Sequence, residues 1–463
     1  MPLHSLLVIR HGRVVLDAAF WPYDGRTPHD IASVTKSIVA TLAGRALSEG
    51  FGVPLDRPLV TTGITDWPTT FDRRLTLAHL LSMSSGFDCA GGDDARALRQ
   101  LRASGDWYRS VAQSPQVARP GTAFRYCSAA THLAAGVLDR SVPGGLATFA
   151  QRQLWTPLGM APPLWPADPQ GVPHGWGDLR LDPHDLARLG LLYLRDGRWR
   201  DRRLLAAGYV RRATSNEAPR RGTPSDVDYG LGWWRLRAPY AGIFEARGRG
   251  GQFLTVWPKR DLIVVMTGAG YDRQPIVRRL LEAQRASGAP LHADPVADSA
   301  LETSIRTAAQ PPARCASPPA RESSQSSASG AMRYAFPGNV AGIATIGWAT
   351  RSAAELAVTL ELVAPSSPAP GRYELAAGLD DCPRVTAGGP LGMPVTLQAH
   401  RDVDAGLEIE YADVAGPTRL TLRITPGEFD AASLHVTDHT GAFGGDFTVA
   451  GRKVDGTDQA SGP

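Results

Sequence analysis

The stretch that decides the fold is HDIASVTKS, residues 29–37. Apolar side chains recur at helical spacing over about Ala32–Glu49, and Gly50 follows where a helix C-cap belongs. The spacing therefore predicts a long amphipathic helix that begins within this stretch. Ser33 and Lys36 are three residues apart, so the helix places both side chains on one face, one turn apart.

This pair of residue types suits nucleophilic catalysis. The positive N-terminus of a helix stabilises an alkoxide or oxyanion near the serine. A buried lysine amine can become neutral and accept the serine proton, whereas an arginine guanidinium stays protonated. Only three of the 49 basic residues are lysines, and a coding bias explains that ratio. Arginine could not do this chemistry at Lys36, however. The competing interpretation is a surface helix that Ser33 merely caps.

The composition is that of a globular chain with more than one domain. Its 463 residues exceed what one core usually holds, and 43% of them are hydrophobic. A net charge of +4 with scattered arginines does not predict a nucleic-acid partner. No apolar run has membrane-spanning length, and Met1–Arg10 lacks the pattern of a signal peptide. We therefore expect a cytoplasmic protein without a membrane partner.

The cysteines give no sign of a cross-linked or metal-binding scaffold. They are far apart in the sequence and form no C-x-x-C pair: Cys89, Cys127, Cys315 and Cys382. This spacing argues against a disulfide scaffold and against a zinc knuckle. Cys127 is interpreted as a buried packing thiol, because nothing marks it as a thiolate.

The pattern along the chain predicts four regions. Residues 1–285 read as one mixed α/β domain whose sheet is assembled from strands at both of its ends. Residues 286–330 form a Pro/Ala/Ser-rich linker. Residues 331–454 alternate with a period of two between Gly- and Pro-rich turns, which predicts a small antiparallel β-sandwich or barrel. Residues 455–463 are expected to be a flexible tail.

Several motifs, taken together, resemble one enzyme superfamily. HDIASVTKS resembles the first motif of the serine β-lactamases and penicillin-binding proteins, and within them the class C-like branch of esterases, D-aminopeptidase-like enzymes and 6-aminohexanoate-dimer hydrolases. Further matches follow in the family's order: LTLAHLLSMSSG (75–86), FRYCS (124–128), PLGM (157–160), DLARLG (185–190), YGLGWW (229–234) and GGQ (250–252). The resemblance implies an antiparallel sheet flanked by helices, together with an all-helical region.

The resemblance also implies roles for individual residues. Ser33 corresponds to the acyl-accepting nucleophile, and Lys36 corresponds to its base. Tyr126 corresponds to the second proton-transfer group, which protonates the leaving group and then helps to activate water. The backbone amide of Ser33 would form one half of the oxyanion hole. No metal or organic cofactor is implied.

Two positions depart from the family pattern. Ser128 stands where much of the family has asparagine, and it could still donate a hydrogen bond to Lys36 or to the substrate. The third motif can be read in two registers. We prefer Arg249-Gly250-Gly251, which keeps a cation, suits an anionic substrate group and makes the amide of Gln252 the second oxyanion donor. The alternative, Ala246-Arg247-Gly248, shifts that amide to Arg249.

The expected function is therefore a serine hydrolase that cleaves an ester or amide bond of a small molecule. A β-lactamase or D-Ala carboxypeptidase is an alternative within the same superfamily, although the usual Lys or His of the third motif is missing. A catalytically silent homologue that serves as a binding or regulatory protein is an alternative from another class. The identity of the substrate and the oligomeric state stay open.

Overall fold

A computed structural model describes residues 2–63, 71–286, 294–315, 329–364, 369–401 and 406–454. The chain divides into two compact units. The larger unit comprises Ser5–Ala18 and Gly25–Pro295, and the smaller unit comprises Met1–His4, Ala19–Asp24 and Val296–Pro463. Two short N-terminal segments thus belong with the C-terminal module, whereas the sequence pattern assigned all of residues 1–285 to one domain.

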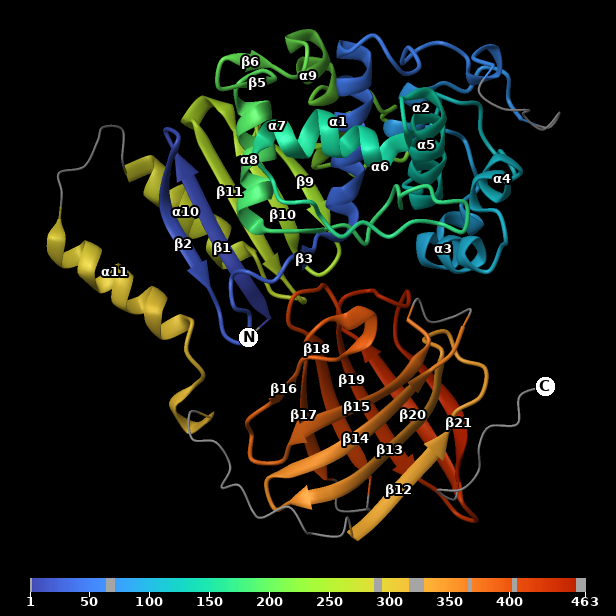
Figure 1. The fold of residues 1–463 in the computed structure, drawn as a ribbon, viewed down its shortest axis with the longest axis vertical. Helices are drawn as coiled ribbons and strands as arrows, with labels where there is room; N and C mark the ends of the chain where they lie inside the picture. Colours follow the sequence, from blue (N-terminus) through green and yellow to red (C-terminus); the bar gives the residue numbers. More distant parts are fainter. Residues whose placement is uncertain are drawn as a thin grey trace. The chain divides into compact units, whose positions relative to one another are not determined.

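The larger unit is built on a seven-stranded sheet with the order β2-β1-β11-β10-β9-β8-β7 (Figure 1). β1 lies between β2 and β11, the last strand of the sheet in sequence, so strands from the two ends of this region meet in one sheet, as predicted. The pairs from β7 to β11 are antiparallel. The strands are β1 (Leu3–Arg10), β2 (Arg13–Ala19), β7 (Val227–Tyr229), β8 (Trp234–Leu236), β9 (Phe244–Gly248), β10 (Gln252–Trp257) and β11 (Leu262–Gly268).

Helices cover both faces of this sheet. On one face, α8 packs on β10 and β11, and alternate strand residues such as Leu254 and Val265 join the main core together with Ile38 of α1. On the other face, Val264 and Met266 form a smaller apolar cluster with α10. The helices are α1 (Thr35–Ser48), α2 (Leu77–Leu81), α3 (Asp94–Arg102), α4 (Trp107–Ala112), α5 (Ser128–Ser141), α6 (Gly145–Ala150), α7 (Thr156–Leu158), α8 (Pro183–Leu194), α9 (Ala207–Ala213) and α10 (Gln274–Ala286).

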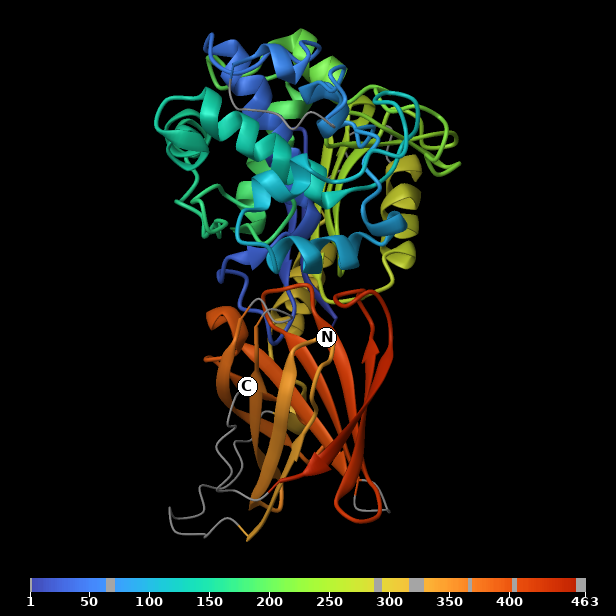
Figure 2. The same ribbon diagram turned by 90° about the vertical axis from the view of Figure 1, so that its right-hand side faces the viewer.

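The smaller unit contains a ten-stranded sheet whose consecutive strands pair antiparallel where the register is described, and a parallel pairing of β15 with β17 closes it (Figure 2). Residues that alternate along the predicted strands, such as Leu356, Ile409 and Leu422, fill its interior. The module is therefore barrel-like rather than a sandwich. Its strands are β12 (Ser329–Ala335), β13 (Ile343–Ser352), β14 (Glu355–Leu362), β15 (Gly371–Gly378), β16 (Arg384–Thr386), β17 (Val395–Arg401), β18 (Leu407–Asp413), β19 (Arg419–Pro426), β20 (Ala431–Asp438) and β21 (Phe447–Lys453).

Part of the predicted linker is helical. Residues Pro295–Ala308 form α11, and none of its residues is buried. This segment therefore adds nothing to a core, as its composition predicts. It is nevertheless a regular helix and not a flexible linker. Of the predicted linker, residues 287–293 and 316–328 lie outside the described residues, as does the predicted tail, 455–463. Within the described ranges, no helix combines the length and the apolar character needed to span a membrane.

The expectation that the chain has no disulfides is wrong. Cys89 pairs with Cys127 in the larger unit, with their Cα atoms 5.8 Å apart. Cys315 pairs with Cys382 in the smaller unit, with their Cα atoms 5.4 Å apart. The pairs are separated by 38 and 67 residues, so the fold, and not a local sequence pattern, brings them together. Cys127 is therefore a cross-link, not a free packing thiol.

Candidate active site

Ser33 occupies an unusual position at the start of the main core helix. It lies in the single turn η1 (Ala32–Val34), which leads directly into α1. Every residue from Ile31 to Ala46 is buried except Ser33. The fold thus buries the whole helix start and leaves one hydroxyl in contact with solvent.

The turn before Ser33 is held by a carboxylate. Ala32 has a φ of +44°, a left-handed conformation that is uncommon for a residue with a side chain. The backbone amide of Ala32 donates a hydrogen bond of 2.7 Å to Oδ1 of Asp30. The Ile31 amide donates to the carbonyl of Leu179, so the strained residue and the residue before it are both anchored. Together these bonds fix the direction in which the Ser33 side chain leaves the turn.

Lys36 meets Ser33 as the spacing predicts. Its side chain is almost fully buried, at 1% exposure, and its Nζ lies 2.8 Å from Oγ of Ser33. Nζ also donates a hydrogen bond of 2.9 Å to the carbonyl of Trp176. Neither of these bonds goes to a carboxylate. The lysine is therefore buried beside the serine with only neutral oxygens as its hydrogen-bond partners in the described part of the chain.

The carbonyl of Trp176 is itself positioned by a buried polar cluster. Nε2 of His132, on α5, lies 3.0 Å from Oδ2 of Asp168, and both side chains are fully buried. Nδ1 of His174 lies 2.8 Å from Oδ2 of Asp178. The Trp176 ring stacks on His174 and packs against His132, with ring centroids 4.7 and 5.1 Å away. These contacts hold the segment that supplies the second oxygen to Lys36.

Tyr126 lies beside Lys36 without a hydrogen bond to it. Nζ of Lys36 is 4.9 Å from the centroid of the Tyr126 ring, and the ring stacks on Trp234 at 6.0 Å. The segment that carries Tyr126 is cross-linked by the disulfide between Cys89 and Cys127. The structure therefore brings Ser33, Lys36 and Tyr126 together, with the phenol ring held between a lysine and a tryptophan.

Ser128 makes no hydrogen bond to Lys36 among the described contacts. Its hydroxyl donates a hydrogen bond of 2.6 Å to Oδ2 of Asp94, and its backbone amide donates to Oδ1 of the same carboxylate at 2.6 Å. Both groups of Ser128 thus tie the start of α5 to the start of α3. The expected hydrogen bond from Ser128 to Lys36 is absent among the described contacts because Asp94, which the sequence reading did not single out, takes the hydroxyl.

The third motif lies at the end of β9, and Gly248 is its closest approach to Ser33. A Cβ atom on Gly248 would stand 2.5 Å from the carbonyl oxygen of Ile31 and 3.2 Å from Cβ of Ala32. Glycine is therefore required where the strand passes the serine turn. This position favours the register Ala246-Arg247-Gly248, which ranked second in the sequence analysis because it has no cation in first place.

The residues of the preferred register are engaged elsewhere. A Cβ on Gly251 would stand 2.4 Å from the ring of Tyr271, whose hydroxyl donates to the Gly251 carbonyl at 2.7 Å. The Gln252 side chain is fully buried and bridges β10 to β11, with Nε2 2.5 Å from the Gly268 carbonyl. Both residues therefore shape the hairpin, and neither approaches Ser33 in a described contact.

Arg249 follows Gly248 and carries its charge into an acidic environment. The pKa of Asp30 is raised from its ordinary value of 3.8 to about 7, first by burial and next by the negative charge of Asp178, while Arg249 opposes the shift. Burial alone would also raise the pKa of Asp178, but the hydrogen bond from His174 and the charges of Arg102 and Arg249 pull it below its usual range. Arg249 therefore already faces two carboxylates.

The raised pKa of Asp30 makes a prediction for stability. The folded protein holds this proton more tightly than the unfolded chain does, so the free energy of unfolding falls as the pH rises from about 4 to about 7. Asp30→Asn keeps an acceptor for the Ala32 amide but has no proton to lose. The difference in the free energy of unfolding between the variant and the wild type, measured by urea unfolding, should rise in favour of the variant by on the order of 3 kcal/mol between pH 4 and pH 8.

The control for this prediction is Asp201→Asn, at an exposed aspartate of the same unit. Its stability relative to the wild type should not change with pH. A pH-independent difference for Asp30→Asn would contradict the assignment of the raised pKa to this carboxyl.

The disulfide near Tyr126 makes a second prediction. Cys89→Ser with Cys127→Ser opens a cross-link that spans 38 residues, which should lower the free energy of unfolding by about 4 kcal/mol from loop entropy. Urea unfolding without reductant measures this loss.

The matched pair Cys315→Ser with Cys382→Ser lies in the other unit and should leave ester hydrolysis unchanged. Loss of the first pair should lower kcat, because that disulfide holds the segment of Tyr126. Four free thiols in the unreduced wild type would contradict both cross-links.

Three contributors to the site escaped the sequence reading. The Trp176 contact uses a main-chain carbonyl, for which no residue type is a signal. Asp94 lies in an ordinary helix-start pattern and becomes a partner of Ser128 only in the fold. Gly248 did leave a signal, since the Ala-Arg-Gly triplet was visible, but the preference for a cation at the first position of the motif ranked it second.

The sequence model of the family described as Beta-lactamase matches residues 2–286 of this chain. No curated protein matches it. A Bacillus anthracis protein provisionally named a 6-aminohexanoate-dimer hydrolase has a similar structure over 62% of this chain and 78% of its own, at 18% identity and a TM-score of 0.52. A D-stereospecific amidohydrolase from Streptomyces sp. is similar over 62% of this chain and 95% of its own, at 18% identity and a TM-score of 0.46.

A further solved structure, an octameric penicillin-binding-protein homologue from Pyrococcus abyssi, is similar over 97% of this chain and 96% of its own, at 15% identity and a TM-score of 0.48. At these identities the structural likeness concerns the fold alone. The family model, by contrast, covers more than half of the chain and spans all the motifs around Ser33. The predicted resemblance is confirmed, and the chain belongs to the β-lactamase family.

Proposed function

We propose that this protein is a serine hydrolase that cleaves an ester or amide bond through an acyl-enzyme on Ser33. One observation carries the proposal: the only solvent-accessible side chain between Ile31 and Ala46 is a serine hydroxyl 2.8 Å from a buried lysine amine. A structural helix cap would require neither the burial of Lys36 nor the left-handed turn at Ala32. The arrangement combines a nucleophile, a base and a fixed direction of attack.

The residues perform the reaction in two halves. The Lys36 amine accepts the Ser33 proton across the 2.8 Å contact while Oγ attacks the carbonyl carbon. When the tetrahedral intermediate collapses, the alcohol or amine leaves with a proton supplied through Lys36 and Tyr126, and the acyl group stays on Oγ. Water then attacks the ester carbon, its proton passes to the same groups, and Ser33 regains its hydrogen as the carboxylate departs.

Backbone amides are assigned to the oxyanion. One is the amide of Ser33, at the start of α1, where the helix dipole favours negative charge. The other is the amide of Arg249, because Gly248 is the residue of the third motif that lies against the serine turn. This assignment replaces the Gln252 amide of the preferred sequence register. An interaction between the Arg249 side chain and an anionic substrate would have to compete with Asp30 and Asp178.

The two disulfides bear on where the enzyme works. Thiols of cytosolic proteins are kept reduced, whereas disulfides persist in oxidising compartments. The pairing of all four cysteines therefore supports a location outside the reducing cytoplasm, in place of the cytoplasmic expectation from the sequence.

A substrate panel tests the proposed function. Steady-state hydrolysis of p-nitrophenyl esters and p-nitroanilides of increasing acyl length should show turnover by the wild type, and Ser33→Ala should lower kcat by at least about 10³-fold. Nitrocefin, assayed in parallel, separates β-lactamase activity from esterase and amidase activity. No turnover of any of these compounds by folded wild type would favour the catalytically silent homologue.

A further inference from the structure

A second pocket lies on the face of the sheet that α10 covers. It has a volume of about 240 Å³ and is lined by β8–β11 and α10. Its strand residues include Glu245, Thr255 and Val264, which alternate with the residues that point into the main core beside α1. This α10 pocket and the helix that carries Ser33 and Lys36 therefore contact opposite faces of the sheet.

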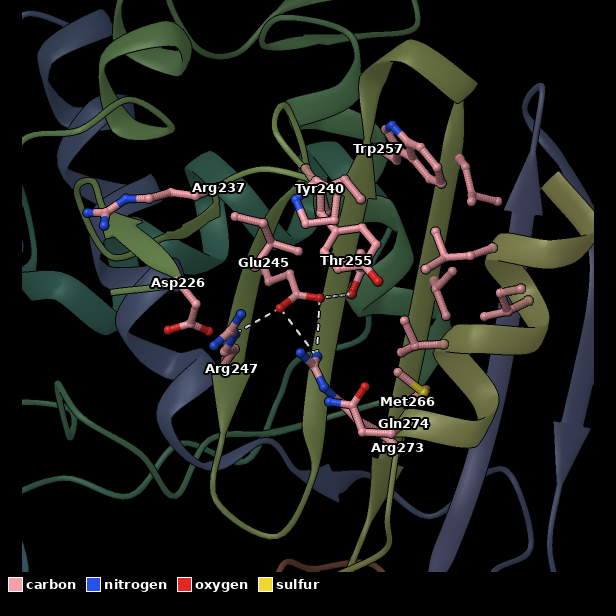
Figure 3. Close-up of a pocket in the computed structure, with 18 of the residues that line it drawn as sticks. Asp226, Arg237, Tyr240, Glu245, Arg247, Thr255, Trp257, Met266, Arg273 and Gln274 are labelled. Atoms are coloured by element: carbon pink, nitrogen blue, oxygen red, sulfur yellow. Dashed lines mark hydrogen bonds and ion pairs between the residues drawn. The ribbon is translucent and has the colours of Figure 1, made fainter. Parts of the chain in front are cut away.

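A single buried carboxylate in the α10 pocket is shared by two arginines (Figure 3). The Glu245 side chain is only 4% exposed. It accepts hydrogen bonds from Nε of Arg247 at 2.7 Å, from Nη1 of Arg273 at 3.2 and 3.3 Å, and from Oγ1 of Thr255 at 2.8 Å. Two guanidinium groups on one carboxylate leave the inside of the pocket with one excess positive charge.

The rim of the pocket does not neutralise this charge. Arg237 is paired with Asp228, at 2.5 and 2.9 Å, and Asp228 does not line the pocket. Asp226 lines the rim but is exposed to solvent, where water screens its charge. Asp228 is also shared with Arg220 and Arg235, so the rim adds positive charge to that of the buried pair formed by Arg247 and Arg273.

Both guanidinium groups are held in place and still have donors to offer. Arg247 lies over the ring of Trp234 at 5.5 Å, and Arg273 lies over the ring of Phe253 at 4.1 Å. The Nη groups of Arg247, and Nε and Nη2 of Arg273, meet no acceptor among the described residues. A guanidinium with free N–H groups and a fixed plane is the preferred partner of a carboxylate.

The walls around these arginines are apolar. Val264, Met266, Val277 and Leu280 line the pocket and pack in the cluster under α10. At ~30 Å³ for the volume of one water, the pocket holds about eight water-sized groups. The site thus pairs a cationic end with a short apolar enclosure, and this combination selects an amphiphilic anion over a bare ion or a hydrocarbon.

We propose that the α10 pocket binds a small organic carboxylate with an apolar tail, at a site separate from Ser33. The carboxylate accepts hydrogen bonds from Arg247 and Arg273, and the tail lies against Met266 and the inner face of α10. Arg247 directly precedes Gly248 of the third motif, but Ser33, Lys36 and Tyr126 do not line the pocket, so this binding does not depend on the proposed function.

Isothermal titration of octanoate into the full-length protein tests the proposal. Octanoate should bind at one site, and it should still bind after Ser33 has been blocked with a fluorophosphonate. Octan-1-ol, which lacks the charge, and inorganic phosphate, which lacks the tail, should each bind at least about tenfold more weakly. Arg273→Gln should weaken octanoate binding by about tenfold or more.

The matched control is Arg279→Gln, which removes the same charge from an exposed position of the same helix and should leave the affinity unchanged. Leu281→Trp fills the pocket from α10 and should abolish binding even if Arg273→Gln proves unstable. Equal affinity for octanoate and octan-1-ol, loss of binding when Ser33 is blocked, or full binding by folded Arg273→Gln or Leu281→Trp would overturn the proposal.

Discussion

Replacing Lys36 by arginine is expected to lower kcat/KM for the best p-nitrophenyl ester by about 10³-fold, the size of effect that a lost general base produces. An arginine guanidinium stays protonated, so the variant has no amine at this position that could accept the Ser33 proton. The contact that carries this function is the 2.8 Å distance between Nζ and Oγ. Lys36→Met, which matches the length of the stem, should show a loss of similar size.

The chain supplies its own control for this experiment. Lys259 is exposed in the turn between β10 and β11, so Lys259→Arg makes the same chemical change away from Ser33. Its kcat/KM should equal that of the wild type. If folded Lys36→Arg kept more than about a tenth of the wild-type activity, a guanidinium would suffice at this position and Lys36 would not be the base.

Replacing Gly248 by alanine is expected to lower kcat by about 10²- to 10³-fold, which is the loss that follows removal of one oxyanion donor. The new Cβ would stand 2.5 Å from the Ile31 carbonyl oxygen, and this neighbour is backbone, which cannot rotate away. β9 must therefore move back from the serine turn and take the Arg249 amide with it. Overpacking of this kind also costs about 1–3 kcal/mol of stability, which urea unfolding measures separately.

Gly105→Ala is the matched control for Gly248→Ala. Gly105 lies in the same unit, is exposed and has no atom within 4 Å of the position where a Cβ would stand. Its kcat and stability should be those of the wild type. Unchanged kcat for Gly248→Ala would argue against an oxyanion hole at the end of β9 and would return the second donor to the Gln252 amide.

The parts of the fold that periodicity controls could be read from the sequence. The residue pattern predicts a helix around Pro183–Leu194, and α8 has these bounds because its apolar face packs on β10 and β11 and Asp182 caps its start. The alternating residues Leu356, Val358 and Leu360 lie in the interior of the barrel-like sheet of the smaller unit. In these segments the local sequence pattern and the tertiary packing favour the same secondary structure.

Features that depend on contacts between distant segments could not be read in this way. The pairing of Cys89 with Cys127, and the hydrogen bonds of Ser128 to Asp94, arise because α3 and α5 pack together. Trp176 contacts Lys36 through its main-chain carbonyl, which every residue type has, so the sequence gives no sign of this contact. The register of the third motif depends on which glycine lies against the turn before Ser33, and this contact joins segments more than 200 residues apart.

The central claim, that Ser33 is the nucleophile, is tested most directly by mass spectrometry of the covalent adduct. Wild type, Ser33→Ala and Lys36→Arg are treated with a fluorophosphonate, and the labelled peptide is sequenced. The account predicts one adduct per chain on Ser33 in the wild type, none in Ser33→Ala and greatly slowed labelling in Lys36→Arg. An adduct on another residue, or labelling of Ser33→Ala at the wild-type rate, would contradict it.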